Sequence, residues 1–305
     1  MATKHKKDNG EVIDYGFLPK VSVIVPVYNA QRTIAECIDS LLRLDYPKEN
    51  LELILVNNAS TDRTADILHH YKGEIEILHE EKRGPAAARN KGLLNARGDV
   101  AAFVDADCVV DEDWLKNIVL PLQDRDVGIV GGKILAKRPC NKIEEFGEEI
   151  HDHNRAINEA KPSYVITMNW ASRLSVLKEV GLFNESFRRG EDVDLSIRIF
   201  QAGYKFVYEP DAIVYHRNEK TLSGLFQEGY LHGYHSIKNH KLHKDFLKKF
   251  GHRRFNLSSY AEILSSFTKF VLGRNQDDSL CYFVFNSGKK VGKFFGSIRF
   301  LYLNL

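Results

Sequence analysis

Residues Val100–Asp107 read VAAFVDAD, an uninterrupted apolar run that ends in two aspartates one residue apart. Five consecutive apolar residues indicate a buried strand, as in a parallel sheet. Carboxylates that directly follow such a strand lie at the edge where an open α/β sheet places its ligands. The stretch therefore predicts an α/β fold in which Asp105 and Asp107 form a seat for a divalent cation and a phosphate-bearing substrate.

The Asp-x-Asp pattern is not specific by itself, because the chain contains it four times. The other three copies stand in polar or helix-like surroundings, where a solvated face or the first turn of a helix explains them: Asp111 and Asp113, Asp124 and Asp126, Asp192 and Asp194. Only Asp105 and Asp107 follow a buried strand. Taken alone, this pair fits a metal site and simple capping of a strand end equally well.

The hydrophobic period alternates between that of a strand and that of a helix along the first 122 residues. Apolar runs typical of strands lie at 21–27, 51–56, 75–78 and 100–104, and runs with helical spacing lie at 33–44, 64–71, 85–96 and 114–122. Strands that alternate with helices of this length form right-handed βαβ units. We therefore predict a mostly parallel central sheet flanked by helices.

The composition is that of an ordinary globular protein: 305 residues, 43% apolar and 28% charged. The four cysteines form no C-x-x-C pair, which argues against a zinc site and for reduced thiols in a cytosolic compartment. The first ten residues are polar, so no signal peptide is expected. Because no apolar run approaches the roughly 18 residues of a membrane span, we expect a chain that does not cross a bilayer.

The net charge of +2 conceals a basic C-terminal tail. Residues 236–305 carry 13 lysines and arginines against 4 aspartates and glutamates, a balance of +9, which leaves −7 for the first 235 residues. Phenylalanine, tyrosine and leucine interleave with these cations, as in Phe246–Phe250 and Lys289–Phe295. The pattern favours an anionic membrane surface, then a plain solvated helix face, then nucleic acid.

A dinucleotide-binding dehydrogenase is excluded at its diagnostic position. Its G-x-G-x-x-G fingerprint should follow the first strand, which instead ends in PVYNA at 26–30. An aromatic ring and an amide at that place suit stacking on a base and hydrogen bonding to a nucleotide. A nucleotidyltransferase is disfavoured, because no glycine-rich phosphate loop with basic residues stands near the N-terminus.

Five motifs occur in order along the chain: VSVIVPVYN at 21–29, VNNASTD at 56–62, GPAAARNKG at 84–92, FVDAD at 103–107 and GEDVD at 190–194. This series resembles the family-two glycosyltransferases that have the A-type nucleotide-sugar fold. Each motif is modest alone, but five in order are specific, and the match covers about residues 20–217. Beyond Asn218 it thins to a helical tail that many bacterial members share in outline only.

The resemblance implies a set of nucleotide-binding residues. Tyr28 would flank the base, with strand-end packing as its alternative role. Asn58 stands where the family usually has an aspartate that accepts a hydrogen bond from the base, and an amide can both accept and donate. Arg89 resembles the arginine near the diphosphate, with a structural salt bridge as its alternative role. The predicted nucleotide-sugar set is Pro26, Tyr28, Asn29, Asn58, Arg89, Asp105 and Ala106.

The resemblance also implies a metal site. Asp107 corresponds to the direct ligand of Mn²⁺ or Mg²⁺, and Asp105 to the carboxylate that reaches the ribose or a metal-bound water. His216 follows the apolar run 212–215 and corresponds to a third ligand in many members of this fold, although a lone histidine there is often structural. An imidazole beside carboxylates favours Mn²⁺ over Mg²⁺.

Glu191 and Asp192 stand at the start of a predicted helix and resemble the catalytic loop of the family. Acidic residues in a first helical turn are often only partners of the helix dipole. In the family, Asp192 corresponds to the general base that removes the proton of an acceptor hydroxyl, which gives single displacement with inversion. Trp170 fits stacking on a sugar in the acceptor cleft and packing in the core equally well.

These observations predict an inverting, metal-dependent transfer of a sugar from a nucleotide-sugar donor, with UDP preferred to GDP or dTDP, to a hydroxyl of a glycan or lipid-linked acceptor. A catalytically silent nucleotide-sugar binder or assembly partner is the alternative, and it has no need of a base. We expect a polar extension at 1–19, a catalytic domain at 20–217 with halves 20–110 and 111–217, and a helical tail at 218–305. The expected location is the inner face of the cytoplasmic membrane, held by peripheral contact, without a nucleic-acid partner.

Overall fold

The structure, a computed structural model, describes residues 4–6, 12–14, 18–252, 258–273 and 276–303. The chain divides into two compact units. The sheet unit comprises Met1–Leu135, His153–Ser186 and Leu195–His216, and the helical unit comprises Ala136–Asp152, Phe187–Asp194 and Arg217–Leu305. The last segment of the helical unit starts at Arg217, one residue before the expected tail at 218–305. That unit also includes residues 136–152 and 187–194, which the sequence does not assign to the tail.

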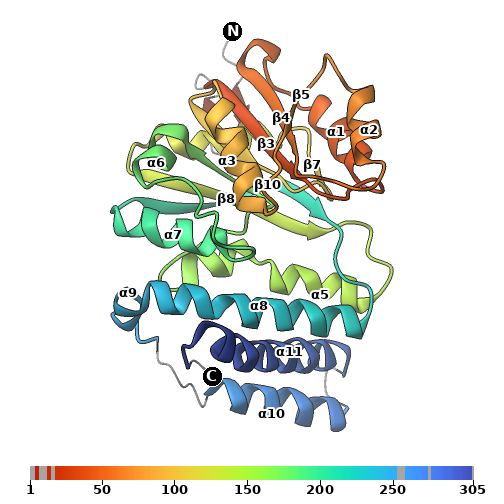
Figure 1. The fold of residues 1–305 in the computed structure, drawn as a ribbon, viewed down its shortest axis with the longest axis vertical. Coiled ribbons are helices and arrows are strands. Elements are labelled where there is room, and N and C mark those ends of the chain that lie inside the picture. Colours follow the sequence, from red (N-terminus) through yellow and green to blue (C-terminus); the bar gives the residue numbers. More distant parts are fainter. Residues whose placement is uncertain (1–3, 7–11, 15–17, 253–257, 274–275, 304–305) are drawn as a thin grey trace. The chain divides into compact units, whose positions relative to one another are not determined.

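The sheet unit contains most of the strands (Figure 1). Its strands are β1 Lys4–Lys6, β2 Val12–Asp14, β3 Val21–Val27, β4 Leu51–Asn57, β5 Glu76–His79, β6 Val100–Phe103, β7 Cys108–Val110, β8 Val127–Ala136, β9 Trp170–Arg173 and β10 Lys205–His216. Its helices are α1 Ile34–Leu42, η1 Lys48–Asn50, α2 Thr64–His70, α3 Pro85–Asn95, α4 Trp114–Val119, η2 Leu120–Gln123, η3 Arg155–Glu159, α6 Leu174–Glu179 and α7 Glu191–Gln201, whose first turn belongs to the helical unit.

The main sheet has eight strands in the order β5-β4-β3-β6-β9-β8-β10-β7. The pairs β5/β4, β4/β3 and β3/β6 are parallel, whereas β6/β9, β9/β8 and β10/β7 are antiparallel. The predicted strands and the α/β class are confirmed. In the parallel half, the motifs that end β3, β4 and β6 lie at one edge of the sheet, because the carboxyl ends of parallel strands meet there.

Helices cover both faces of the sheet, and the alternation of β3 shows how. Val21, Val23, Val25 and Val27 pack with α1, α2 and α4 in one apolar cluster. Ile24 points to the opposite face, where it packs with α3, α6 and α7 in a second cluster. Successive side chains of a strand point to opposite faces, so a nearly continuous apolar strand is what a sheet covered on both sides requires.

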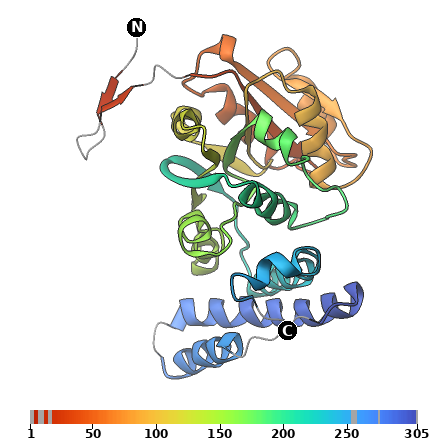
Figure 2. The ribbon, with the colours of Figure 1, turned by 90° about the vertical axis from the view of Figure 1, so that its left-hand side faces the viewer.

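The helical unit consists of α5 Lys142–Ile150, α8 Leu222–Leu242, α9 Lys244–Lys248, α10 Ser258–Val271 and α11 Gln276–Phe300. Helix α11 lies between α8 and α10 (Figures 1 and 2). Among the described residues, none of the helices combines the length and the apolar character that crossing a membrane requires.

Glycines bring α8 and α11 into backbone contact. A β-carbon on Gly292 would overlap the carbonyl oxygen of Tyr230, and one on Gly233 would overlap that of Lys289. The same holds for Gly229, Gly288 and Gly296, with partners whose numbers rise along both helices. The two helices are therefore parallel, and the G-x-x-x-G spacing places the small residues on one face of each.

Candidate active site

Strand register brings Asp107 and His216 together. Strand β6 ends at Phe103, and the chain then turns through Asp105 and Asp107 into β7. Strand β7 pairs with β10, the last strand of the sheet unit, so that Cys108 lies opposite His216. The Nε2 atom of His216 is 3.6 Å from a carboxylate oxygen of Asp107. The two residues are 109 positions apart in the sequence, yet the sheet edge makes them neighbours.

The environment keeps Asp107 ionised. Burial acts to raise the pKa of Asp107, but the hydrogen bond and the charge of His216 outweigh it and lower this pKa below its ordinary value. The side chain of Asp107 remains 45% exposed, whereas that of His216 is 12% exposed. The edge thus presents one accessible carboxylate backed by an imidazole, and Asp107, Cys108 and His216 converge closely enough for their ligand atoms to share one ion.

Asp105 has a different partner. Arg89, on α3, donates to Asp105 Oδ1 at 2.7 Å, and its guanidinium also lies 5.7 Å from the ring centre of Phe183. The side chain of Arg89 is only 2% exposed. Arg89 therefore holds Asp105 in place from the protein interior, and the prediction that it lies beside a diphosphate gives way to the structural salt bridge.

An exposed aromatic ring stands at the end of β3. Tyr28 is 49% exposed, and the guanidinium of Arg83 lies 5.6 Å from its ring centre. Asn29 next to it has a left-handed backbone with φ of 49°, and its side-chain oxygen accepts from Thr61 N at 2.8 Å. The sequence analysis missed Arg83. The basic pair Lys82 and Arg83 directly before the GPAAARNKG motif is the signal that could have found it.

Asn58 binds the loop 80–84. Its amide nitrogen donates to the carbonyl oxygens of Glu80 and Lys82, and its oxygen accepts from Gly84 N at 2.8 Å. The side chain is buried. These bonds tie the loop 80–84 to the end of β4, and they use the amide for which a base contact was predicted. Pro26 and Ala106 are partly buried and buried, and they can offer a ligand only their backbone.

Trp170 belongs to the core. It lies on β9 directly opposite Phe103, stacks on that ring with centroids 4.4 Å apart, and contacts Phe183 edge to face. It has no exposed surface. The predicted acceptor contact of Trp170 is therefore wrong, because a ring enclosed by two aromatic neighbours offers no face to a sugar.

Glu191 and Asp192 open α7 within the helical unit. Glu191 is buried, and Asp192 is partly buried with one carboxylate oxygen accepting from Val193 N at 2.8 Å. Gly190 directly before them has φ of 79°, a conformation that favours glycine. This turn sets the start of the helix so that the two acids occupy its first turn.

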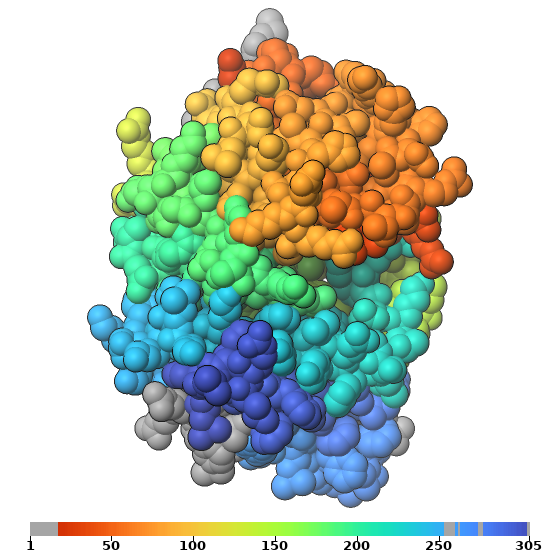
Figure 3. All heavy atoms as spheres, in the orientation of Figure 1, coloured from red at the N-terminus to blue at the C-terminus, as the bar shows by residue number. Residues whose placement is uncertain are grey.

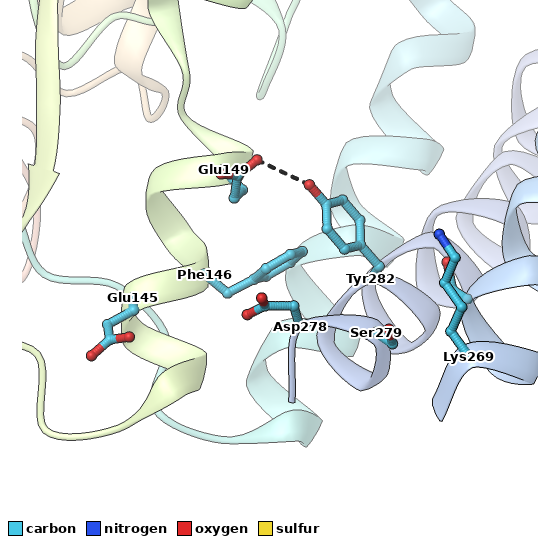
Figure 4. A pocket seen from close by; sticks show the side chains of 8 residues that line it. Glu145, Phe146, Glu149, Lys269, Asp278, Ser279 and Tyr282 are labelled. Carbon is cyan, nitrogen blue, oxygen red and sulfur yellow. Dashed lines mark hydrogen bonds between the residues drawn. The ribbon is translucent and has the colours of Figure 1, made fainter. Parts of the chain in front are cut away.

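The helical unit also contains a cavity of about 590 Å³ between α5, α10 and α11. It is lined by Glu145, Phe146, Glu149, Ser266, Lys269, Asp278, Ser279 and Tyr282. Figure 4 shows the Tyr282 hydroxyl donating to Glu149, with Phe146 beside the tyrosine ring. None of the predicted site residues lines this cavity.

Comparison with known proteins identifies the family. The profile of "Glycosyl transferase family 2" matches residues 22–181, more than half of the chain. The protein belongs to this family and is a glycosyltransferase. The resemblance predicted from the five motifs is thereby confirmed.

Two relatives illustrate the range of the match. The chain is 32% identical over 204 residues to glycosyltransferase AglE of Haloferax volcanii, which covers 65% of this chain and 67% of that protein. It is 29% identical over 220 residues to the probable glycosyltransferase YdaM of Bacillus subtilis, which covers 67% of this chain. The matched region spans about half of YdaM, 52% of its length.

Solved structures share the fold. The mannosyltransferase PcManGT from Pyrobaculum calidifontis, in complex with GDP-Man and Mn²⁺, has a TM-score of 0.70 at 20% identity and covers 92% of this chain and 88% of its own. TarS residues 1–349 of S. aureus, in complex with UDP, have a TM-score of 0.55 at 18% identity and cover 92% and 91%. Both likenesses confirm the A-type fold.

Proposed function

We propose that the protein transfers a sugar from a nucleotide-sugar donor to an acceptor hydroxyl with inversion at the anomeric carbon, in a reaction that depends on a divalent metal. The observation that carries this proposal is the Asp107 carboxylate at the sheet edge with His216 Nε2 3.6 Å away. Family membership supports the sugar transfer, and the sheet edge supplies the chemistry for the diphosphate.

Asp107 and His216 fit a divalent cation. A partly exposed carboxylate and an imidazole within 3.6 Å offer the oxygen and nitrogen donors that Mn²⁺ accepts more readily than Mg²⁺ does. Bound there, the cation would neutralise the nucleoside diphosphate as it leaves. Arg89 binds one carboxylate oxygen of Asp105, and the other oxygen would accept a hydrogen bond from the ribose or from a water. PcManGT with Mn²⁺ in its complex supports this proposal.

Tyr28 and Arg83 would bind the nucleotide. The exposed ring of Tyr28 can stack on a base, and Arg83 beside it can pair with a phosphate or stack on the same base. With Asn58 committed to the loop 80–84, base selection depends on backbone groups near this loop. We propose UDP as the nucleotide of the donor; the neighbours in complex with UDP and with GDP-Man make these two the pair to separate by experiment.

Asp192 would act as the general base. It stands in the first turn of α7 after the positive-φ turn at Gly190, and it matches the acid of the family's catalytic loop. A carboxylate at that place can take the proton of the acceptor hydroxyl as its oxygen attacks the anomeric carbon. The presence of both acids, Glu191 and Asp192, favours an active enzyme over a silent nucleotide-sugar binder.

The tail would hold the enzyme on an anionic membrane, where a lipid-linked acceptor is found. Exposed apolar side chains form stripes at helical spacing on α10 and α11: Tyr260, Leu264, Phe267 and Val271, then Val291, Phe294, Phe295 and Ile298. Lys269 and Arg299 flank them, and Figure 3 shows part of α11 (dark blue) at the molecular surface. Apolar stripes with basic borders suit the headgroup region of a bilayer.

Donor turnover tests the function directly. Hydrolysis and transfer should be assayed with a panel of UDP-, GDP- and dTDP-sugars, with Mn²⁺, with Mg²⁺ and with EDTA. We expect turnover of one nucleotide class, loss of it in EDTA, and inverted anomeric configuration of the product by NMR. A retained configuration contradicts single displacement, and nucleotide-sugar binding without turnover on any acceptor favours the silent binder.

Vesicle sedimentation tests the membrane contact. Each basic residue near an anionic surface contributes roughly 1 kcal/mol, so the full-length protein should sediment with anionic vesicles at low salt and dissociate as the Debye length falls to about 3 Å at 1 M. Phe294→Ser with Ile298→Ser should weaken sedimentation, whereas Lys178→Ala, in the sheet unit, should not. Equal sedimentation of all variants contradicts the membrane role.

A further inference from the structure

The segment Phe187–Asp194, which carries the acid pair, is fastened along α8 within the helical unit. Lys238 Nζ lies 4.3 Å from the ring centre of Phe187. Asn239 Nδ2 donates to the carbonyl oxygen of Gly190 at 2.7 Å. His243 Nε2 lies 2.8 Å from a carboxylate oxygen of Asp194; Asp194 is buried and His243 is partly buried. Three successive contacts thus fix the backbone of this segment along α8.

Arg188 and Arg189 lie inside this fastened stretch. Both are exposed, and within the described residues neither forms an ion pair. Burial, followed by the charges of Arg189, Arg188 and Lys238, lowers the pKa of His235, so these cations act on one imidazole of α8. The fold therefore gathers the positive charges of Arg188, Arg189 and Lys238 around a segment whose backbone contacts α8.

Helix α11 adds to this positive region. The contact of Gly233 with the backbone of Lys289 places that lysine beside α8. The charges of Lys289 and Arg189 act on His232. Burial, together with the charges of Lys289 and Lys290, lowers the pKa of Lys293 to about 8. The nearby acids Asp194 and Glu228 contact His243 and His151, and their charges also reach Lys238 and His232.

The same charges bear on whether this region binds a cation or an anion. His151, Glu228 and His232 bring three ligand atoms within 4.8 Å of one another and could hold a cation. Burial, with the charges of Lys289 and Arg189, lowers the pKa of His232 to about 4 against the opposing charge of Glu228, so these surroundings disfavour a positive charge. Like charges close together destabilise one another, whereas an anion gains from every one of them. The region favours an anionic ligand.

We propose that Arg188 and Arg189, with Lys238 beside them, bind a phosphate or diphosphate group of the acceptor. The two arginines precede Asp192 by four and three residues, so their backbone lies within about 14 Å of the proposed base. This distance suits an acceptor sugar joined directly to a phosphate ester. Two guanidinium forks match phosphate oxygens in a bidentate way. The inference rests on the proposed function and specifies its acceptor.

Binding without turnover tests the inference independently of catalysis. Farnesyl phosphate, farnesyl diphosphate and inorganic pyrophosphate should be titrated calorimetrically into the full-length protein in EDTA with saturating UDP. We expect binding that R188A/R189A weakens at least tenfold and that Lys244→Ala, an exposed lysine of the same unit, leaves unchanged. Equal affinity for pyrophosphate and farnesyl diphosphate assigns the contact to phosphate alone, and tighter binding of the farnesyl ligand adds a contact to its lipid. Absence of binding, or binding that the double variant does not change, overturns the inference.

Kinetics supply the second test. With a sugar diphosphate lipid as acceptor, R188A/R189A should raise the KM for the acceptor about tenfold or more and leave the KM for the donor unchanged. With an alkyl glycoside that lacks phosphate, wild type and variant should behave alike. R188K/R189K should fall between them, because lysine keeps the charge but loses the fork. An equal effect on both acceptors overturns the inference while the transferase stands, whereas no transfer with any acceptor defeats the proposed function and leaves the binding test to decide.

Discussion

The contacts that stabilise the interior of the sheet unit differ in kind from those that stabilise the interior of the helical unit. In the sheet unit, β-branched and aliphatic side chains fill two clusters on the two faces of one sheet. In the helical unit, α8 and α11 meet backbone to backbone at glycines, and the apolar cluster around Phe146, Leu225, Cys281 and Phe285 is small. A wide apolar core tolerates polar residues at its edge, whereas a glycine contact tolerates no added atom.

The difference extends to the proposed site residues. The sheet unit places Asp105, Asp107 and His216 at the ends of strands, where removal of a side chain takes little from the core. The helical unit places Glu191 and Asp192 on a segment that α8 holds by side-chain contacts. Changes at the sheet edge should therefore alter chemistry alone, and changes on α8 or α11 should alter structure first.

The largest effect is expected at Asp107. Asp107→Ala should lower transfer by about a thousandfold or more, because the side chain is the accessible carboxylate of the proposed metal site. Thermal unfolding should shift little. Calorimetry of nucleotide-sugar binding with and without Mn²⁺ checks the assignment: wild type should gain affinity from the metal and the variant should not. An unchanged metal effect in the variant would remove Asp107 from the site.

The next effect is expected at the glycine contact. Gly292→Leu should destabilise the helical unit by about 3 kcal/mol or more, because its side chain would overlap the backbone of Tyr230. Hydrogen exchange should become fast in α8 and α11 and remain slow in β3, β4 and β6. Ala261→Leu, on the exposed surface of α10, is the matched control and should leave exchange unchanged. Equal loss of protection in both units would show that they unfold together.

A smaller effect is expected at Asp192. Asp192→Asn should lower kcat by about a hundredfold and leave donor affinity unchanged, since an amide of the same size cannot take the proton of the acceptor. Single-turnover assays beside donor titrations separate the two quantities. Equal losses of binding and turnover would mark Asp192 as structural and would contradict its role as the general base.

The smallest effect is expected at Glu185, in the sheet unit. Hydrogen bonds from Lys82 and Asn90 lower the pKa of Glu185 from its ordinary 4.5. A carboxyl whose pKa is lower in the folded state stabilises above its unfolded pKa and loses this contribution as pH falls through the folded value. Glu185→Gln should therefore cost about 1 kcal/mol or less at pH 7, because the group is one-third exposed. Denaturant titrations should show the difference shrink as the pH falls below 4.5; a difference that does not change with pH would contradict this origin.

The sequence alone determined the order of β3, α1, β4, α2, β5, α3, β6 and α4 and the position of the carboxylate pair, whereas it did not predict β1, β2 and β7. These features depend on neighbours within a few residues, since a strand and a helix each impose their own period on apolar side chains. The five ordered motifs also identified the family, which the profile match confirms.

The tertiary structure alone decided which polar side chains remain accessible. Arg89 and Trp170 each had two roles that the sequence left open, and the structure shows their long-range neighbours: Asp105 binds the arginine, and Phe103 and Phe183 enclose the indole. The sequence also did not show that the loop 80–84 binds the amide of Asn58. The pairing of α8 with α11 likewise depends on glycines some 60 residues apart. The period of a segment shows which face is buried but not what covers it, because the covering residues come from distant parts of the chain.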